Sequence, residues 1–253
     1  MSNEELWHDL LTGEGSVIAR QRRRNRHLPG SPRCKTCLHP LGGPLAPVLR
    51  LVTHRTRSAM NPTHCNLCEE LVHTHPGGAE IELSLLFADV RGSTTLAEGM
   101  SPAEFGRLMN KFYDSANRVL IDSDGFVDKL VGDEVIGLYV PLLAPDHART
   151  AIEAARDLLR ATAPSLPVGA GVHTGTAYVG AVGSYGTVTD FTALGDAVNV
   201  AARLSGLAAV GEVLVSEDAH RASGLDLGAL EQRRLELKGR SAPIDVRVLR
   251  IDG

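Results

Sequence analysis

The sequence has no apolar run close to the roughly 20 residues that a membrane-spanning helix needs. Its N-terminus is polar and lacks the apolar core of a secretory signal, so we expect a cytoplasmic protein with no membrane span. It also has no internal repeat and no low-complexity tract. With 253 residues, of which 43% are hydrophobic, the chain can bury one sizeable core and has room for a small second unit.

Acidic residues are scarce at the start of the chain and abundant after it. Residues 1–80 carry a net charge of +3 and the whole chain carries −4, so residues 81–253 carry −7. An acidic region of this kind needs cations if it is to handle a polyanionic ligand. The basic excess includes five arginines between Arg20 and Arg26, with no aromatic residue among them. We interpret this run as a solvated helix face and expect no nucleic-acid partner.

Cysteine is also rare, and all four cysteines lie close together. They form Cys34-x-x-Cys37 and Cys65-x-x-Cys68, with 27 residues between the pairs. Two thiolates two residues apart can share one ion, so the paired motifs favour a structural zinc. An iron–sulfur cluster, a redox-active dithiol and plain buried thiols are the alternatives. We predict a basic, Cys-rich module over residues 1–78, in which the segment between the pairs is too poor in regular signals to fold without a metal.

Two short aliphatic runs, Leu85–Ala88 and Val135–Val140, are bounded by glycine or proline and are predicted to be buried strands. Asp89 ends the first run, and Asp133 lies at the turn that enters the second. Carboxylates on neighbouring strands can converge on hard divalent cations, which take oxygen ligands. The Gly92 turn leads into a helix and leaves backbone N–H groups open for phosphate. This combination predicts metal-assisted phosphoryl transfer on a nucleotide.

The order of the predicted elements indicates the fold class. From residue 79 it runs strand, helix, strand, strand, helix, strand, which is the ferredoxin-like α+β order βαββαβ. One more helix and four more strands complete a domain over residues 79–253. The predicted helices are Pro102–Ile121, Asp146–Ala163 and Ala197–Leu207. The predicted strands are Leu83–Val90, Gly125–Val131, Glu134–Val140, Val168–His173, Ala177–Val182, Val213–Val215, Leu230–Leu237 and Ile244–Leu249.

Four segments of this domain carry a family resemblance: Leu86–Thr94, Lys129–Glu134, His173–Gly175 and Leu194–Arg203. In this order and spacing they resemble the catalytic domain of class III adenylyl and guanylyl cyclases. The resemblance implies an adenylyl cyclase that converts ATP to 3′,5′-cyclic AMP and pyrophosphate, with sites shared between the two chains of a homodimer. Residues 1–80 lie outside it.

The resemblance also implies a metal site. Asp89, Asp133 and the Val90 carbonyl would hold two Mg2+ or Mn2+ ions, which activate the ribose 3′-hydroxyl and clamp the triphosphate. The phosphate cradle would be the turn of Gly92, Ser93 and Thr94.

The remaining roles implied by the resemblance concern the base, the ribose and the phosphates. Lys129 and Thr192 match the positions that read the purine, and a lysine donor with a hydroxyl acceptor fits adenine. Asn199 would position the ribose. Arg203 would stabilise the charge that builds up on the α-phosphate, and Lys238 would neutralise the terminal phosphates.

The chain departs from the family pattern at two positions. Ser93 stands where phenylalanine is common, and Glu212 stands in a segment where some relatives have a phosphate-binding arginine. We expect Lys238 and Arg240 to compensate for the second change. The family gives His173 no catalytic part, so we expect an ordinary hydrogen-bonded strand histidine.

Three other functions stay open. A guanylyl cyclase would differ only in its base pocket. A diguanylate cyclase is suggested by Gly132-Asp133-Glu134, although the helix with Asn199 and Arg203 argues against it. A nucleotide-sensing or interaction module is the non-enzyme alternative, and the presence of both aspartates with Asn199 and Arg203 argues against that one.

Overall fold

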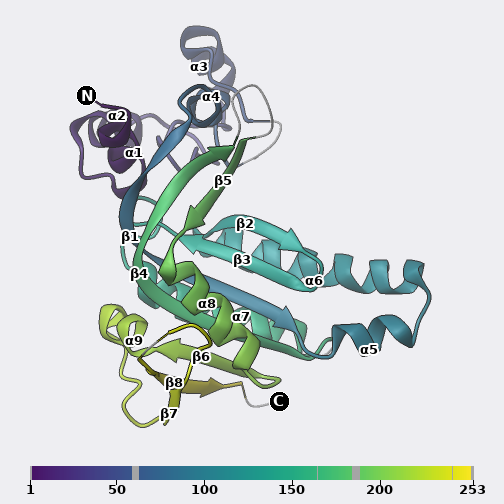
Figure 1. Ribbon diagram of the computed structural model, residues 1–253. Coiled ribbons are helices and arrows are strands. Elements are labelled where there is room, and N and C mark those ends of the chain that lie inside the picture. The colour runs from purple at the N-terminus through teal and green to yellow at the C-terminus, as the bar shows by residue number, and fades with distance from the viewer. Residues whose placement is uncertain (1, 59–62, 164, 184–188, 241, 252–253) are drawn as a thin grey trace. The chain divides into compact units, whose positions relative to one another are not determined.

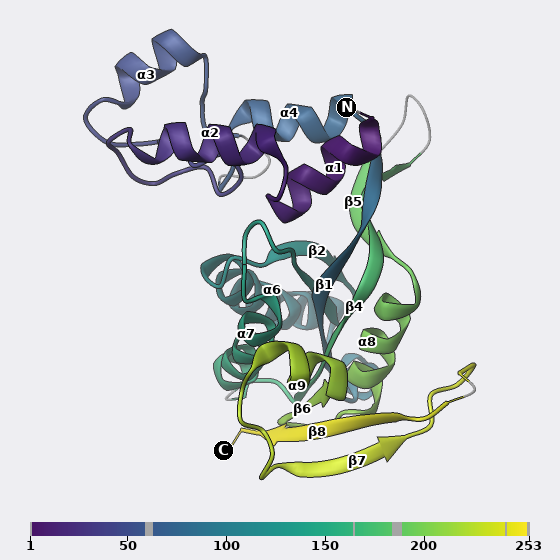
Figure 2. The same cartoon turned by 90° about the vertical axis from the view of Figure 1, so that its left-hand side faces the viewer.

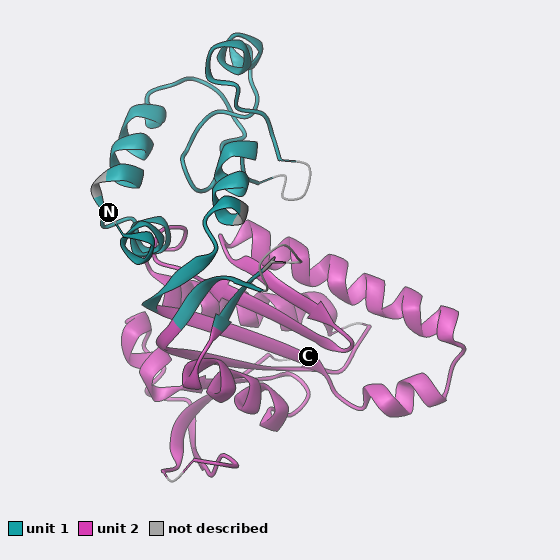
Figure 3. Cartoon of the chain, turned by 45° about the horizontal axis from the view of Figure 1, so that its top comes forward, with its two compact units in different colours: residues 1–81, 178–193 teal, residues 82–177, 194–253 magenta. Residues whose placement is uncertain are grey.

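The computed structural model describes residues 2–58, 63–163, 165–183, 189–240 and 242–251 (Figure 1). The chain divides into two compact units (Figure 3). Unit 1 comprises residues 1–81 and 178–193, and unit 2 comprises residues 82–177 and 194–253. The long strands β1 (Gly77–Val90) and β4 (Val168–Gly183) contribute residues to both units.

Unit 2 contains the core elements in the predicted order. Its helices are α5 (Ser93–Glu98), α6 (Pro102–Asp122), α7 (His147–Thr162), α8 (Asp196–Leu207) and α9 (Glu217–Ser223). Its other strands are β2 (Phe126–Val131), β3 (Glu134–Tyr139), β6 (Glu212–Ser216), β7 (Glu231–Leu235) and β8 (Ile244–Arg250). The sheet has the order β2-β3-β1-β4-β6-β8-β7, and β5 (Thr189–Leu194) pairs with β4. The α+β fold and its βαββαβ core are thus confirmed.

Helix α6 illustrates how the sequence determines an element. The Ser101 hydroxyl accepts a hydrogen bond from the Glu104 N–H at 3.3 Å, and the Glu104 carboxylate accepts one from the Ser101 N–H at 2.9 Å. Pro102 occupies the first turn, where its missing N–H costs nothing. The buried side chains recur at helical spacing, at Met109, Phe112, Ala116 and Leu120.

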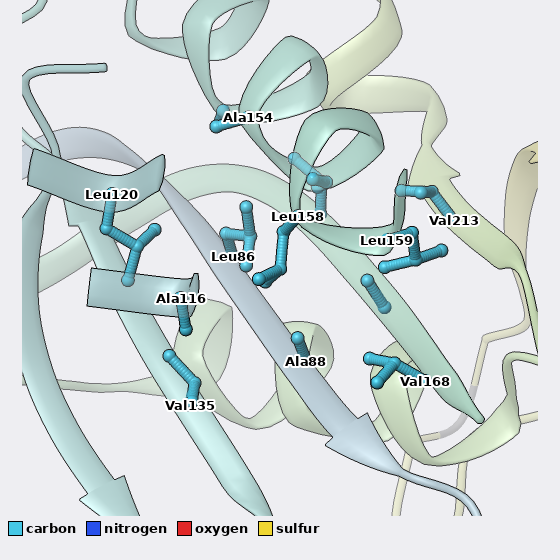
Figure 4. Packing of buried hydrophobic residues seen from close by; sticks show 14 of the residues in the cluster. Leu86, Ala88, Ala116, Leu120, Val135, Ala154, Leu158, Leu159, Val168 and Val213 are labelled. Atoms are coloured by element: carbon cyan, nitrogen blue, oxygen red, sulfur yellow. The ribbon is translucent and has the colours of Figure 1, made fainter. Parts of the chain in front are cut away.

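The two faces of the sheet are covered by different helices. Helices α6 and α7 lie on one face and α8 on the other (Figure 2). On the first face, α7 packs through Leu158 on Leu86 and Ala88, which are alternate residues of β1 (Figure 4). Each fully buried leucine there contributes about 1.5–3 kcal/mol. On the second face, Val200 and Leu204 of α8 pack against β6 and β8.

Strand β4 corrects one expectation. The predicted strands Val168–His173 and Ala177–Val182 form one continuous strand. The predicted gap covered residues 174–176, and Gly175 within it allows a close approach: a Cβ there would lie 3.2 Å from the Cβ of Ala197 on α8. Strand β5 and helix α9 were not predicted, because elements of six and seven residues are too short for a clear periodic signal.

The predicted N-terminal module ends at Pro76-Gly77-Gly78, and strand β1 begins within this stretch, at Gly77. A Cβ on Gly78 would lie 2.3 Å from the Val179 carbonyl oxygen, and one on Gly180 would lie 2.2 Å from the Gly77 carbonyl oxygen. These glycines therefore allow β1 and β4 to approach closely.

Unit 1 contains the helices α1 (Asn3–Thr12), α2 (Ser16–Arg26), α3 (Ala46–Thr53) and α4 (Asn66–Thr74). Trp7 is buried; its indole N–H donates to the His75 carbonyl at 2.9 Å, and its ring stacks on Phe191 with centroids 6.1 Å apart. Among the described residues, no helix is long and apolar enough to cross a membrane.

Two features of unit 1 add detail to the sequence analysis. Helix α3 lies between the cysteine pairs, in the segment where regular signals are weak. The arginine run is not wholly solvated, because Arg22 donates to the carbonyls of Lys35 and Thr36, both at 2.9 Å. Charge spacing alone cannot distinguish an exposed arginine from one that braces a loop.

Glu212 has a structural role in unit 2. Its buried carboxylate accepts hydrogen bonds from Arg233 at 2.6 and 2.8 Å and from Arg250 at 3.0 Å. The bond from Arg233 is the main cause that lowers the pKa of Glu212 from 4.5 to about 2. This carboxylate joins β6 to β7 and β8.

We predict that Glu212→Gln lowers the free energy of unfolding at pH 7 by about 2 kcal/mol, after allowance for solvent around the half-exposed arginines. Because the pKa is lowered in the folded state, this contribution is complete above the unfolded value of 4.5 and is lost as the pH falls toward about 2. Urea unfolding at several pH values measures it. The exposed Glu231→Gln is the control and should have a much smaller effect; equal losses, or a Glu212 effect that persists at pH 2, would contradict the prediction.

Candidate active site and candidate metal centre

Two carboxylates meet where β1 ends beside the turn between β2 and β3. In the register of β1 against β3, Asp89 pairs with Glu134. Glu134 directly follows Asp133 in the sequence. The Val90 N–H donates to the Asp133 carbonyl at 3.0 Å and ties the end of β1 to the turn. Gly132 supplies the positive φ of 63° that the turn requires. The side chains of Asp89 and Asp133 thereby come into direct interaction.

The Asp89 carboxylate is suited to receive a cation. Its Oδ1 atom is buried and accepts no hydrogen bond from any described residue. Burial raises the pKa of Asp89, with Asp133 adding to the rise and Arg91 opposing it. Burial and the two aspartates also raise the pKa of Glu134. An orphaned carboxylate oxygen beside further carboxylates fits a hard divalent cation, which would supply the missing positive charge.

Arg91 was not predicted to take part, yet it contacts this site. Its guanidinium forms an ion pair with the Asp89 carboxylate and donates to the Gly206 carbonyl at 2.9 Å. Its backbone N–H donates to the Pro167 carbonyl at 2.6 Å. The one signal in the sequence was an arginine two residues after a strand-end aspartate, a spacing short enough for the side chain to fold back.

Ser93 and Thr94 begin α5 directly after Gly92. Gly92 has a φ of 68°, and no side chain among the described residues caps α5, so its first N–H groups are open. The Ser93 hydroxyl donates a hydrogen bond to the Asp133 carboxylate, and Thr94 is exposed. Ser93 can therefore orient Asp133, which a phenylalanine at this position could not do.

The two residues expected to read the base lie in different units. Lys129 belongs to β2 in unit 2, where its Nζ lies 3.3 Å from Asp128 Oδ1. The register of β2 against β3 shifts between Val127 and Lys129, and such an irregularity re-aims the side chains that follow. Thr192 belongs to β5 in unit 1 and is buried.

Helix α8 carries the two residues that were expected to act on the ribose and the α-phosphate. Asn199 and Arg203 lie one turn apart and share a face of the helix. Asn199 is exposed, and Arg203 forms no ion pair with any described residue. A Cβ on Gly239 would lie 3.5 Å from an Nη atom of Arg203, so this guanidinium reaches the loop after β7. Lys238 in that loop is exposed and lines a hollow of about 470 Å³.

A second hollow of about 710 Å³ lies at the start of α8 and is lined in part by Asp196, Arg240 and His173. Arg240 is engaged in an ion pair with Asp196. His173 is buried with its Nδ1 atom 2.8 Å from Ser216 Oγ, the ordinary hydrogen-bonded arrangement that was expected.

These strands and helices match a known family. The model of the adenylate and guanylate cyclase catalytic domain matches residues 79–248. The chain belongs to this family. The resemblance seen in the sequence is thereby confirmed.

Individual cyclases agree with the family match. The adenylate cyclase of Anabaena cylindrica is 33% identical over 136 residues, which are 49% of this chain and 27% of that protein. The adenylate cyclase of Mycobacterium tuberculosis is 32% identical over 168 residues, 63% of this chain and 37% of that protein. The chain thus spans well under half the length of these relatives. The crystal structure of the guanylyl cyclase Cya2 superposes with a TM-score of 0.63 at 25% identity, covering 68% of this chain and 93% of that one.

The four cysteines lie in unit 1, outside the part matched by the cyclase family. All four are buried, and their Sγ atoms lie within 4.8 Å of one another. The Sγ atoms of Cys37 and Cys65 are 3.8 Å apart, too far for a disulfide. A tetrahedral zinc site with Zn–S bonds of about 2.3 Å has sulfur–sulfur edges of about 3.8 Å. Cys34, Cys37, Cys65 and Cys68 therefore fit a single tetrahedral ion.

Polar groups around the sulfurs favour thiolates. Arg55 donates to Cys37 Sγ at 3.1 Å and to Cys65 Sγ at 3.2 Å. The Cys65 N–H donates to Cys34 Sγ at 3.3 Å. Donors of this kind stabilise the charged form of a thiol, which is the form that binds metal. Arg55 was missed in the sequence because its position between the pairs carries no spacing signal.

Proposed function

We propose that this chain is an adenylyl cyclase that converts ATP to 3′,5′-cyclic AMP and pyrophosphate in the cytoplasm. The observation that carries the proposal is the buried Asp89 Oδ1, unpartnered among the described residues, beside Asp133 in a member of the cyclase family. The similarity to relatives named adenylate cyclase favours ATP. A guanylyl cyclase is the second candidate, because the guanylyl cyclase Cya2 shares the fold.

The reaction joins the ribose 3′-oxygen to the α-phosphorus as the bond to pyrophosphate breaks, and the hydroxyl proton passes to water. Asp89, Asp133 and the Val90 carbonyl would hold two Mg2+ or Mn2+ ions, which would lower the pKa of the 3′-hydroxyl and offset the charge of the triphosphate. Ser93 would keep Asp133 oriented, and the open N–H groups at the start of α5 would donate to phosphate oxygens.

Cations of the chain itself would act on the phosphates. Arg203 would stabilise the charge that develops on the α-phosphate, and its lack of an ion pair among the described residues leaves it available for that role. Asn199, one turn earlier on α8, would position the ribose. Lys238 would neutralise the terminal phosphates beside the hollow that it lines.

The active sites would be shared between the two chains of a homodimer. One chain would supply the metal carboxylates, and the other would supply the base-reading and transition-state residues. Large aliphatic side chains are exposed beside both groups: Val131 near the Gly132 turn is 59% exposed, and Leu207 at the end of α8 is 51% exposed. Exposed aliphatic residues on functional elements support a face that is covered in an assembly.

A direct test offers ATP and GTP separately to the purified chain, each with Mg2+ and with Mn2+, and identifies the products by mass spectrometry. Cyclic AMP with pyrophosphate from ATP supports the proposal. Cyclic GMP with pyrophosphate, formed from GTP, as the main product would favour the second candidate. A cyclic dinucleotide as the product, or no turnover with either metal, would overturn both.

The base preference gives a further prediction. Lys129→Glu together with Thr192→Lys should raise the ratio of kcat/KM for GTP to kcat/KM for ATP by about 100-fold or more. A site built to hydrogen-bond one base leaves polar groups unpaired when it binds the other. The control is Lys111→Glu, the same charge change on an exposed position of α6. Unchanged selectivity in the double variant would place base recognition elsewhere.

We further propose that residues 1–78 form a module stapled by one structural zinc ion and that residues 79–253 form the catalytic domain. The mutual distances of the four sulfurs and the donors that surround them support zinc. For a small segment of this kind, metal-binding free energy is also folding free energy. The ion would order the module and support the dimer, and it would take no part in the chemistry.

Elemental analysis should therefore find about one zinc per chain. Cys34→Ser with Cys37→Ser should abolish zinc binding and lower activity most at low protein concentration, where loss of the dimer has the greatest effect. Ser58→Ala, a change in the same module that leaves all four thiols in place, is the control for zinc content. Iron with acid-labile sulfide would indicate a cluster instead, and metal-free protein with full activity would leave plain thiols.

A further inference from the structure

The module that holds the cysteines has a charge that the cyclase reaction does not use. Between Gly15 and Cys68 the sequence contains ten Lys and Arg residues and no Asp or Glu. Four thiolates with one zinc ion would still leave a net charge of about +8. Six of the basic side chains are exposed, namely Arg20, Arg23, Arg24, Arg26, Arg50 and Arg57. The segment therefore presents a dense positive surface.

The same segment exposes an apolar stripe on α3. Leu45, Val48 and Val52 recur at helical spacing on one side, with Leu51 beside them. Their exposed fractions are 47%, 60% and 72%, and that of Leu51 is 78%. We call these four residues the α3 stripe. Exposing four neighbouring aliphatic side chains to water is unfavourable, so the α3 stripe indicates a contact surface.

Polar contacts, and not the stripe, hold α3 in its unit. Thr53 Oγ1 lies 3.3 Å from His39 Nε2, and Arg50 donates to the Leu41 carbonyl at 3.3 Å. Asn66 donates to the carbonyl of His54, the residue after α3, also at 3.3 Å. Within unit 1, α3 and the C-terminal end of α2 lie at the end remote from α1 (Figures 2 and 3). Helix α3, which carries the stripe, and the last turn of α2, which carries arginines, thus lie toward the same end of unit 1.

We propose that this end of the module docks on an anionic lipid bilayer, with the α3 stripe in the interface and the arginines at the headgroups. Aliphatic side chains beside exposed arginines are what an interfacial helix offers to a negatively charged membrane. A second copy of the chain fits less well, because it would bring two strongly positive segments together. A nucleic acid would match the charge but would leave the aliphatic stripe in water. The proposal is independent of the cyclase activity.

The test is co-sedimentation of the full zinc-loaded chain with vesicles of phosphatidylcholine alone or mixed with phosphatidylglycerol. We expect binding only to the anionic vesicles, weakened by salt because the headgroup attraction is screened. Leu51→Glu should reduce it at least about tenfold, because a carboxylate replaces an inserted aliphatic group. Val17→Glu is the matched control: it adds the same charge at an exposed aliphatic position of α2 outside the stripe and should retain most of the binding. Zinc content and thermal unfolding establish that both variants fold.

Four outcomes would overturn the proposal. Equal binding to neutral and anionic vesicles would show that the positive surface is not used. Equal losses of vesicle binding in Leu51→Glu and Val17→Glu would show that the added charge alone matters. No binding to either vesicle would exclude a lipid partner. A lower mass for Leu51→Glu in light scattering, without any effect on lipid binding, would assign the stripe to a contact between copies of the chain.

Discussion

Replacing Asp89 with alanine is expected to lower ATP turnover by at least about 1000-fold, because loss of a metal ligand removes several kcal/mol of transition-state stabilisation at 1.36 kcal/mol per factor of ten. Asp133→Ala should have a comparable effect, since the two carboxylates interact directly and would hold the same pair of ions. The measurement is cyclic AMP formation at saturating Mn2+. Near-normal activity in either variant would refute the metal assignment.

The fold should survive the loss of Asp89. The Asp89 side chain is partly buried, its buried Oδ1 atom has no hydrogen-bond partner among the described residues, and its pKa is raised mainly by burial. A raised carboxyl pKa means that the ionised form is disfavoured in the folded state, so at neutral pH this group opposes folding. We expect Asp89→Asn to unfold at the same temperature as the parent chain or a higher one while remaining inactive. Asp157→Ala, on the exposed surface of α7, is the control that should keep both activity and stability.

Several elements of this chain could be predicted from the sequence because the signals that specify them are local. Long amphipathic helices such as α6 were predicted almost to the residue, because their capping and apolar spacing are local properties. The pairing of β1 with the β2–β3 hairpin followed from two short aliphatic runs and a turn. Asp89 and Asp133 could be named because each lies at the end or the turn of such an element.

Other features depend on tertiary contacts that leave no local pattern. Gly175 resembles a strand break in the sequence, but it is a point of close packing between β4 and α8. Arg91 and Arg55 each look like one more arginine in the sequence, yet one pairs with Asp89 and the other donates to two sulfurs. Glu212 was interpreted as a lost phosphate contact, whereas its carboxylate is bound by Arg233 and Arg250 within the sheet. In each case the partner lies on another element or in an irregular loop.

The second large effect concerns how the catalytic residues are shared between chains. Arg203→Ala alone should reduce turnover about 100- to 1000-fold, as expected when a donor to developing charge is removed. A mixture of Asp89→Ala chains and Arg203→Ala chains should nevertheless recover activity. In a heterodimer with shared sites, one site would combine both lesions, and the other would have an intact aspartate from one chain and an intact arginine from the other. With random pairing of equal amounts, the mixture should reach about a quarter of the parent activity.

The structure gives this experiment a specific control. The Arg203 side chain reaches Gly239, whereas Asp89 pairs with Arg91, so each substitution removes a side chain from a separate local cluster. Mixing Asp89→Ala with Asp133→Ala should recover nothing, because both lesions fall on the carboxylates that one chain would contribute to each site. Recovery in the first mixture but not in the second would identify the division of residues between the chains. No recovery in either mixture, with heterodimers demonstrated by differently tagged chains, would mean that each site is built within one chain.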